Sequence, residues 1–134
     1  DYFVRRADGT GLVVDCRPVE RREPADVAKF EATRVACDGL GWEYRLVGAV
    51  GPVLVANVRW LSGYRHPRHD VGEVAARLGE VFATPGSLMA GAEAAGDPIR
   101  VLPVLFHLLW RHWLVADLSV PLSQASVVVS GGAW

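Results

Sequence analysis

One stretch of the sequence decides the fold: DYFVRRADGTGLVVDCRP, residues 1–18. Strand-forming residues at 2–6 and 12–17 flank Asp8-Gly9-Thr10-Gly11, whose composition is typical of a hairpin turn. We therefore predict an antiparallel β-hairpin. With residues 7–11 as the loop, Asp1 would face Arg17 and Phe3 would face Asp15 across it.

Three charged residues share one face of this predicted hairpin. Side chains alternate between the faces of a strand, so Asp1, Asp15 and Arg17 fall on the same side. A loop shorter by one residue would turn Asp1 to the other face. The opposite face is predicted to point into a core, and it consists of Tyr2, Val4, Leu12, Val14 and Cys16.

Two carboxylates beside a cation suit metal-assisted cleavage of a phosphodiester. Mg²⁺ is commonly held by one or two carboxylates, and its other positions go to water and phosphate. The metal lowers the pKa of its bound water and stabilises the charge on the phosphate. The alternative is a half-exposed hairpin that carries an ordinary surface Asp–Arg pair.

Further motifs narrow the choice of family. They are Asp1 followed by Asp15-Cys16-Arg17, then 30–33 (FEAT), Cys37, 41–44 (GWEY), 57–65 (NVRWLSGYR) and 101–110 (VLPVLFHLLW). Together they resemble TnsA-like endonuclease subunits of heteromeric transposases, of actinobacterial type, within the PD-(D/E)xK restriction-endonuclease-like superfamily. The chain departs from that pattern at Arg17, where lysine is usual. The guanidinium of arginine presents its N–H donors in a fixed plane and stays protonated.

The resemblance implies a function and a set of site residues. Asp1, Asp15 and Arg17 would be catalytic, and Asp1, Asp15 and the Cys16 carbonyl would hold Mg²⁺ or Mn²⁺. Expected partners are DNA, an integrase-like transposase subunit and an AAA+ transposition ATPase. The family's other acid, a Glu on a preceding helix, would lie upstream of residue 1, and with no initiator Met this suggests a fragment. The alternative function is a catalytically inactive nuclease-like scaffold that joins proteins or DNA.

The rest of the chain predicts an α/β (α+β) protein of two domains. Residues 1–69 would form a truncated restriction-endonuclease-like domain, and residues 70–134 a small helical, winged-helix-like domain. Helices are expected over 25–38, 52–61, 71–82, 87–95 and 99–113, with strands at 42–47, 114–118 and 126–129. The strand–helix–strand order over 12–47 predicts a parallel pair.

Charge and composition restrict the partners. The net charge is −1, so nucleic-acid binding must come from local patches such as Arg65 and Arg68. The alternative interpretation of this segment is a solvated linker between the domains. The apolar run 101–115 contains His107 and Arg111 and is too short for a membrane span. Cys16 and Cys37 have no metal-ligand spacing and suggest a reducing, cytoplasmic location. Because the apolar helix has few groups for reading DNA bases, protein docking is as well supported as DNA contact.

Overall fold

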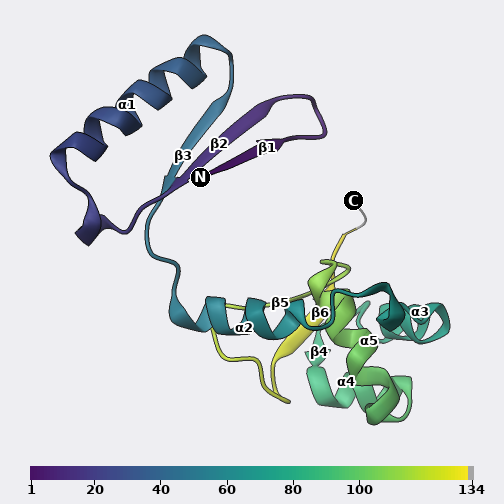
Figure 1. The fold of residues 1–134 in the computed structure, drawn as a ribbon. Coiled ribbons are helices and arrows are strands. Elements are labelled where there is room, and N and C mark those ends of the chain that lie inside the picture. The colour runs from purple at the N-terminus through teal and green to yellow at the C-terminus, as the bar shows by residue number, and fades with distance from the viewer. Residues whose placement is uncertain (133–134) are drawn as a thin grey trace. The chain divides into compact units, whose positions relative to one another are not determined.

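A computed structural model describes residues 1–132 of the chain. Within that range it contains five α-helices and two three-stranded sheets, which confirms the α+β class (Figure 1). Its contacts divide the chain into a first unit, Asp1–Val50, and a second unit, Gly51–Trp134. The domain boundary predicted at residues 69 and 70 lies inside this second unit.

The first unit is a hairpin followed by a helix and a third strand. Its elements are β1 (Tyr2–Arg5), β2 (Gly11–Cys16), a short 3₁₀ helix (Val19–Arg21), α1 (Pro24–Gly39) and β3 (Glu43–Val47). The sheet order is β1-β2-β3, with β1 antiparallel and β3 parallel to β2 (Figure 1). The predicted parallel pair joined through a helix is thus confirmed.

The register of the hairpin differs from the prediction by two residues. Phe3 faces Val13 and not Asp15, and continuing this register by one residue sets Asp1 opposite Asp15 and not Arg17. The loop is tighter than predicted because Gly9 adopts φ +85°, and the Arg6 amide donates to the Thr10 carbonyl at 2.9 Å. A shift of two keeps every side chain on its predicted face, so Asp1 and Asp15 still share one side.

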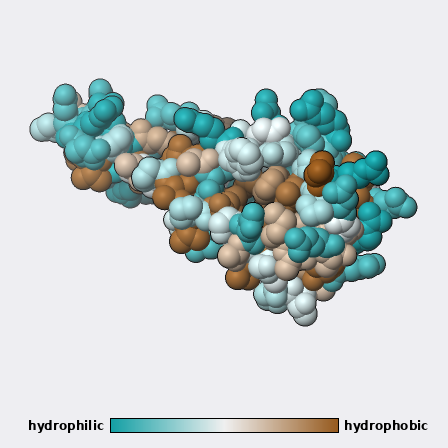
Figure 2. Space-filling view, turned by 90° about the horizontal axis from the view of Figure 1, so that it is seen from below, coloured by the Kyte–Doolittle hydropathy of each residue, from teal (hydrophilic) through white to brown (hydrophobic). Residues whose placement is uncertain are grey.

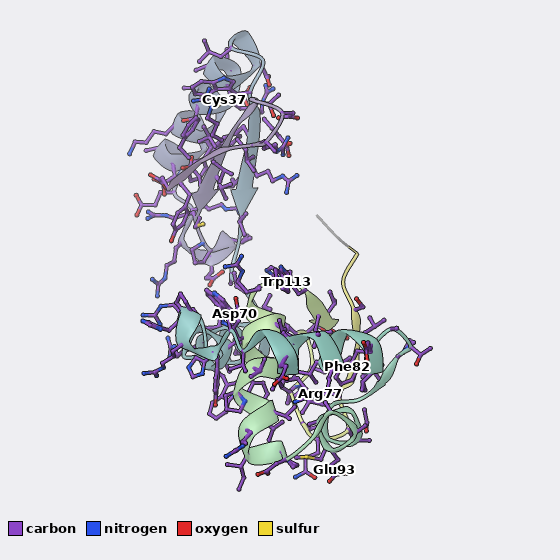
Figure 3. The ribbon with its side chains drawn as sticks, turned by 90° about the vertical axis from the view of Figure 1, so that its right-hand side faces the viewer. Cys37, Asp70, Arg77, Phe82, Glu93 and Trp113 are labelled. Carbon is purple, nitrogen blue, oxygen red and sulfur yellow. The ribbon has the colours of Figure 1, made fainter. Side chains whose placement is uncertain are left out.

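The predicted core face of the hairpin was wrong for three of its five residues, whereas Leu12 is buried and Val14 is half-buried. Tyr2 and Val4 are 66% and 42% exposed, and Cys16 is exposed as well. The reason is that α1 packs on the opposite face, the one that carries Val13, Asp15 and Tyr44. Its inward stripe follows helical spacing and ends at the buried Cys37, labelled in Figure 3.

The second unit surrounds a central apolar helix. Its helices are α2 (Pro52–Ser62), α3 (Gly72–Val81), α4 (Leu88–Ala95) and α5 (Pro98–Trp110), with a 3₁₀ turn at Pro67–His69. Its sheet has the order β4-β6-β5, formed by Gly86–Ser87, Val127–Ser130 and Leu114–Ala116. The two-residue β4 was not predicted. Ser87 and Asp97 cap the helices that follow them, because Ser87 accepts from the Ala90 amide and Asp97 accepts from the Ile99 amide.

The core of the second unit lies between α3, α4 and α5. Phe82 is fully buried there, in the region where Figure 3 labels it. Gly91 of α4 lies directly against the Phe82 ring, so a Cβ at this position would overlap the ring. Close contact between α4 and Phe82 therefore requires glycine at position 91.

Helix α5 ends three residues earlier than predicted. His112 adopts φ +59°, which breaks the helix before β5 begins at Leu114. His107 is 3% exposed, and its Nδ1 lies 2.7 Å from the Tyr64 carbonyl oxygen. Among residues 1–132, α5 and every other helix fall short of the length and apolarity needed to cross a bilayer.

Candidate active site

A cavity of about 470 Å³ in the first unit brings the predicted catalytic residues together. It opens between the hairpin and α1, on the sheet face that the helix covers. Four of its lining residues were predicted, and two further charged residues come from α1. The six are Asp1, Asp15, Cys16, Arg17, Asp26 and Lys29.

Asp15 is the most buried acidic residue of this cavity. It is 9% exposed, and the Tyr44 hydroxyl donates to its Oδ2 at 2.8 Å. Within residues 1–132 no other group donates a hydrogen bond to either of its oxygens. A buried carboxylate is stable only with partners for its charge. Asp15 therefore has unused capacity to accept a cation or a hydrogen-bond donor.

Tyr44 is placed beside Asp15 by the parallel register of β2 and β3. Val13 pairs with Tyr44 and Asp15 pairs with Leu46, so these side chains share one face. Burial, together with the hydrogen bond to Asp15, raises the pKa of Tyr44 to about 12. The phenol thus stays protonated at neutral pH and remains a donor to the carboxylate.

Arg17 lines the cavity, and part of its charge is already matched. Its Nη2 lies 2.9 Å from Asp26 Oδ2, and its Nε donates to the Arg21 carbonyl at 3.1 Å. The pKa of Asp26 is lowered by the hydrogen bond from the Glu23 amide and then by Arg17. Arg17 is therefore held toward the first turn of α1.

Asp1 and Cys16 contribute differently to the cavity. Asp1 is exposed, and strand alternation turns the exposed Cys16 thiol away from Asp15, so Cys16 reaches the cavity through its backbone. No cluster of three or more His, Cys, Asp or Glu within residues 1–132 is arranged as a metal site. Three carboxylates line the cavity, those of Asp1, Asp15 and Asp26, and the carboxylate of Asp26 is already paired with Arg17.

Three residues of the site were missed in the sequence, namely Asp26, Lys29 and Tyr44. Lys29, the one lysine of the chain, lines the cavity with its Nζ 4.0 Å from Asp26 Oδ1. The helical spacing of Asp26, Phe30 and Thr33 places Lys29 at the edge of the stripe that faces the sheet. Tyr44 could have been found from the sequence. The predicted parallel pairing of 12–17 with 42–47 places alternate side chains of the second strand on the same sheet face as Asp15.

Glu43 and the predicted DNA-binding residues Arg65 and Arg68 lie outside this cavity. Glu43 is on the opposite sheet face, where Arg6 and Arg45 bind it; the hydrogen bond from Arg6, then that from Arg45, lowers the pKa of Glu43. Arg65 and Arg68 belong to the second unit and are exposed. Arg65 donates to the Ser62 carbonyl at 2.8 Å, and Arg68 to His69 Nε2 at 3.2 Å.

No protein-family model, curated protein or solved structure matches this chain. The resemblance to TnsA-like subunits accordingly depends on the sequence motifs alone. The chemical argument depends on the cavity between the hairpin and α1.

Proposed function

We propose that this chain is the DNA endonuclease subunit of a heteromeric transposase, which hydrolyses phosphodiesters at transposon ends with Mg²⁺ or Mn²⁺. The observation that carries the proposal is that Asp1 and Asp15 line one cavity together, with Asp15 buried. The hairpin, helix and parallel strand of the first unit agree with a truncated restriction-endonuclease-like domain. The helices and the strands β5 and β6 of the second unit agree with a winged-helix-like domain.

The residues present fit a divalent cation that keeps part of its hydration shell. The carboxylates of Asp1 and Asp15 and the carbonyl of Cys16 would hold it. When bound, Mg²⁺ supplies a water of lowered pKa and neutralises charge on the phosphate. Tyr44 fixes one oxygen of Asp15, which leaves the other free to face the cavity.

The chain's own cations would position the DNA phosphate. Arg17 and Lys29 both line the cavity, so the scissile phosphate would enter between positive side chains and the two acids. Arg17 is shared with Asp26, whereas the Lys29 amine is 4.0 Å from that carboxylate. Lys29 is therefore the cation more available to a phosphate, and it would compensate for the lysine that Arg17 replaces.

A nicking assay tests the proposal. The protein, an integrase-like partner and an AAA+ ATPase are combined with transposon-end DNA and Mg²⁺. Asp15→Asn should abolish nicking, whereas Glu20→Gln, at an exposed acid outside the cavity, should leave nicking unchanged. Nicking that Asp15→Asn does not alter would contradict the proposed role.

The pairing of Arg17 with Asp26 favours a second candidate function. A cation already bound to a carboxylate is poorly placed for catalysis, and no cluster of three metal-ligating side chains occurs within residues 1–132. The first unit would then be a nuclease-like scaffold without chemistry, and the chain would join proteins or DNA in a transposition complex. Loss of Mn²⁺ binding on Asp15→Asn would exclude this scaffold.

A further inference from the structure

The second unit carries a continuous strip of rings on its surface. Trp60 of α2 contacts Tyr64 and Phe106, with ring centroids 5.8 Å and 6.0 Å away. The Tyr64 ring in turn contacts the rings of Phe106 and His69 in tilted arrangements, with centroids 4.9 Å and 5.4 Å away. We call these four residues the aromatic strip.

The strip is open to solvent at its indole. Trp60 is 57% exposed, while its neighbour Leu61 is 2% exposed and takes the core position on α2. Apolar side chains also reach the surface on the face drawn in Figure 2. Beneath the strip, the buried His107 contacts the Tyr64 carbonyl at 2.7 Å. The rings are thus held on a rigid support with one large aromatic face uncovered.

The segment that supplies three of the four strip residues is positively charged. Between Gly51 and His69 the sequence has Arg59, Arg65 and Arg68 and no Asp or Glu. All three arginines are exposed, and none forms an ion pair with a carboxylate of residues 1–132. Arg68 contacts His69, the last ring of the strip, at 3.2 Å. The nearest acid along the chain is Asp70, labelled in Figure 3.

We propose that the aromatic strip, with Arg65 and Arg68, binds single-stranded nucleic acid. Unpaired bases would stack on the exposed indole of Trp60, and the arginines would contact the phosphates beside them. A duplex stacks its bases on one another and leaves the indole without a partner, so the strip favours unpaired strands. An acidic protein segment would bind the same arginines but would leave the exposed Trp60 ring without a partner, so single-stranded nucleic acid fits the surface better.

This inference adds to the proposed function the form of DNA that the second unit holds. Its test measures binding and contains no cleavage step. A chain that does not bind single strands can therefore be distinguished from a chain that does not nick DNA.

The test is fluorescence anisotropy of the protein with a labelled oligothymidine and with a duplex of the same length. We expect the single strand to bind more tightly than the duplex. Trp60→Ala should weaken single-strand binding about tenfold. Arg65→Gln combined with Arg68→Gln should weaken it and make it less sensitive to salt. Circular dichroism verifies that each variant keeps its fold.

Trp113→Ala is the matched control, because Trp113 is 53% exposed and also lies beside an arginine, Arg111, at 6.0 Å. This variant should bind like the unchanged protein. The proposal is overturned if the unchanged protein does not bind the single strand, or if Trp60→Ala binds it equally well. It is also overturned if polyglutamate binds as tightly and displaces the oligothymidine, since charge alone would then explain the surface.

Discussion

The hydroxyl of Tyr44 donates a hydrogen bond to Oδ2 of Asp15 at 2.8 Å, across the parallel pair of β2 and β3. This bond joins a buried carboxylate to a residue 29 positions away in the sequence. It fixes the orientation of Asp15 in the cavity that Asp1 also lines. In the proposed nuclease, Tyr44 is accordingly a positioning residue for the metal-binding carboxylate.

Tyr44→Phe should lower the free energy of unfolding by about 1–3 kcal/mol, because it leaves Asp15 buried without its donor. Urea denaturation followed by circular dichroism measures the change. Tyr2→Phe is the control, since Tyr2 is 66% exposed and its hydroxyl makes no hydrogen bond within residues 1–132. Equal midpoints for both variants would show that the bond contributes nothing.

The phenol of Tyr44 should also lose its proton at a higher pH than that of an exposed tyrosine. Folding raises its pKa from 10.0 to about 12, so the folded chain keeps a proton that the unfolded chain loses. This contribution to stability is complete below pH 10 and is lost as the pH rises through about 12. The phenolate absorbance of the unchanged protein minus that of Tyr44→Phe reports this group. A midpoint near 10 in protein that circular dichroism shows to be folded would contradict the partial burial of Tyr44 and its hydrogen bond to Asp15.

One substitution should have opposite effects at two helix positions. Gly91→Ala places a methyl group against the Phe82 ring and should destabilise the second unit by about 1–3 kcal/mol. Gly79 of α3 has open space at the same point, so Gly79→Ala should stabilise the helix by about 0.5–1 kcal/mol. Thermal unfolding of both variants checks the signs. Stabilisation by Gly91→Ala would mean that α4 does not pack on Phe82.

Asn57 holds a long connection in place. It is 8% exposed, and its Nδ2 donates to the carbonyls of Leu118 and Val120 at 2.9 Å and 2.7 Å. Asn57→Ala removes both donors and should lower the free energy of unfolding by about 1–3 kcal/mol. Amide hydrogen exchange should show lost protection at Leu122, whose amide donates to Asn57 Oδ1 at 3.3 Å.

Gln124→Ala is the control for Asn57, because Gln124 is an exposed amide of the segment that follows this connection. It should leave both the unfolding and the exchange unchanged. If Asn57→Ala behaved in the same way, the connection would be held by other contacts.

Local sequence signals predicted the elements and the faces of the hairpin. Turn chemistry at Asp8-Gly9 and alternation along the strands were enough to put Asp1 and Asp15 on one side. The register was wrong by two because composition does not distinguish the tighter loop, which depends on the left-handed backbone of Gly9.

The sequence could not show which face of the sheet α1 covers. Both hairpin faces carry apolar residues, and the structure shows that α1 packs on the face that carries Val13 and Asp15. For the same reason Tyr44 and Lys29 were missed, because each joins the site through a contact distant in sequence. The partner of Arg17, Asp26, likewise follows from the placement of the first turn of α1.

Calorimetric titration of the protein with Mn²⁺ is the most direct test of whether Asp1 and Asp15 hold a metal together. Asp1→Asn, Asp15→Asn and the control Glu20→Gln are compared with the unchanged chain. The account predicts one Mn²⁺ site in the unchanged chain and in Glu20→Gln, weakened by Asp1→Asn and abolished by Asp15→Asn. Absence of Mn²⁺ binding by the unchanged chain, or binding that both aspartate substitutions leave intact, would contradict it.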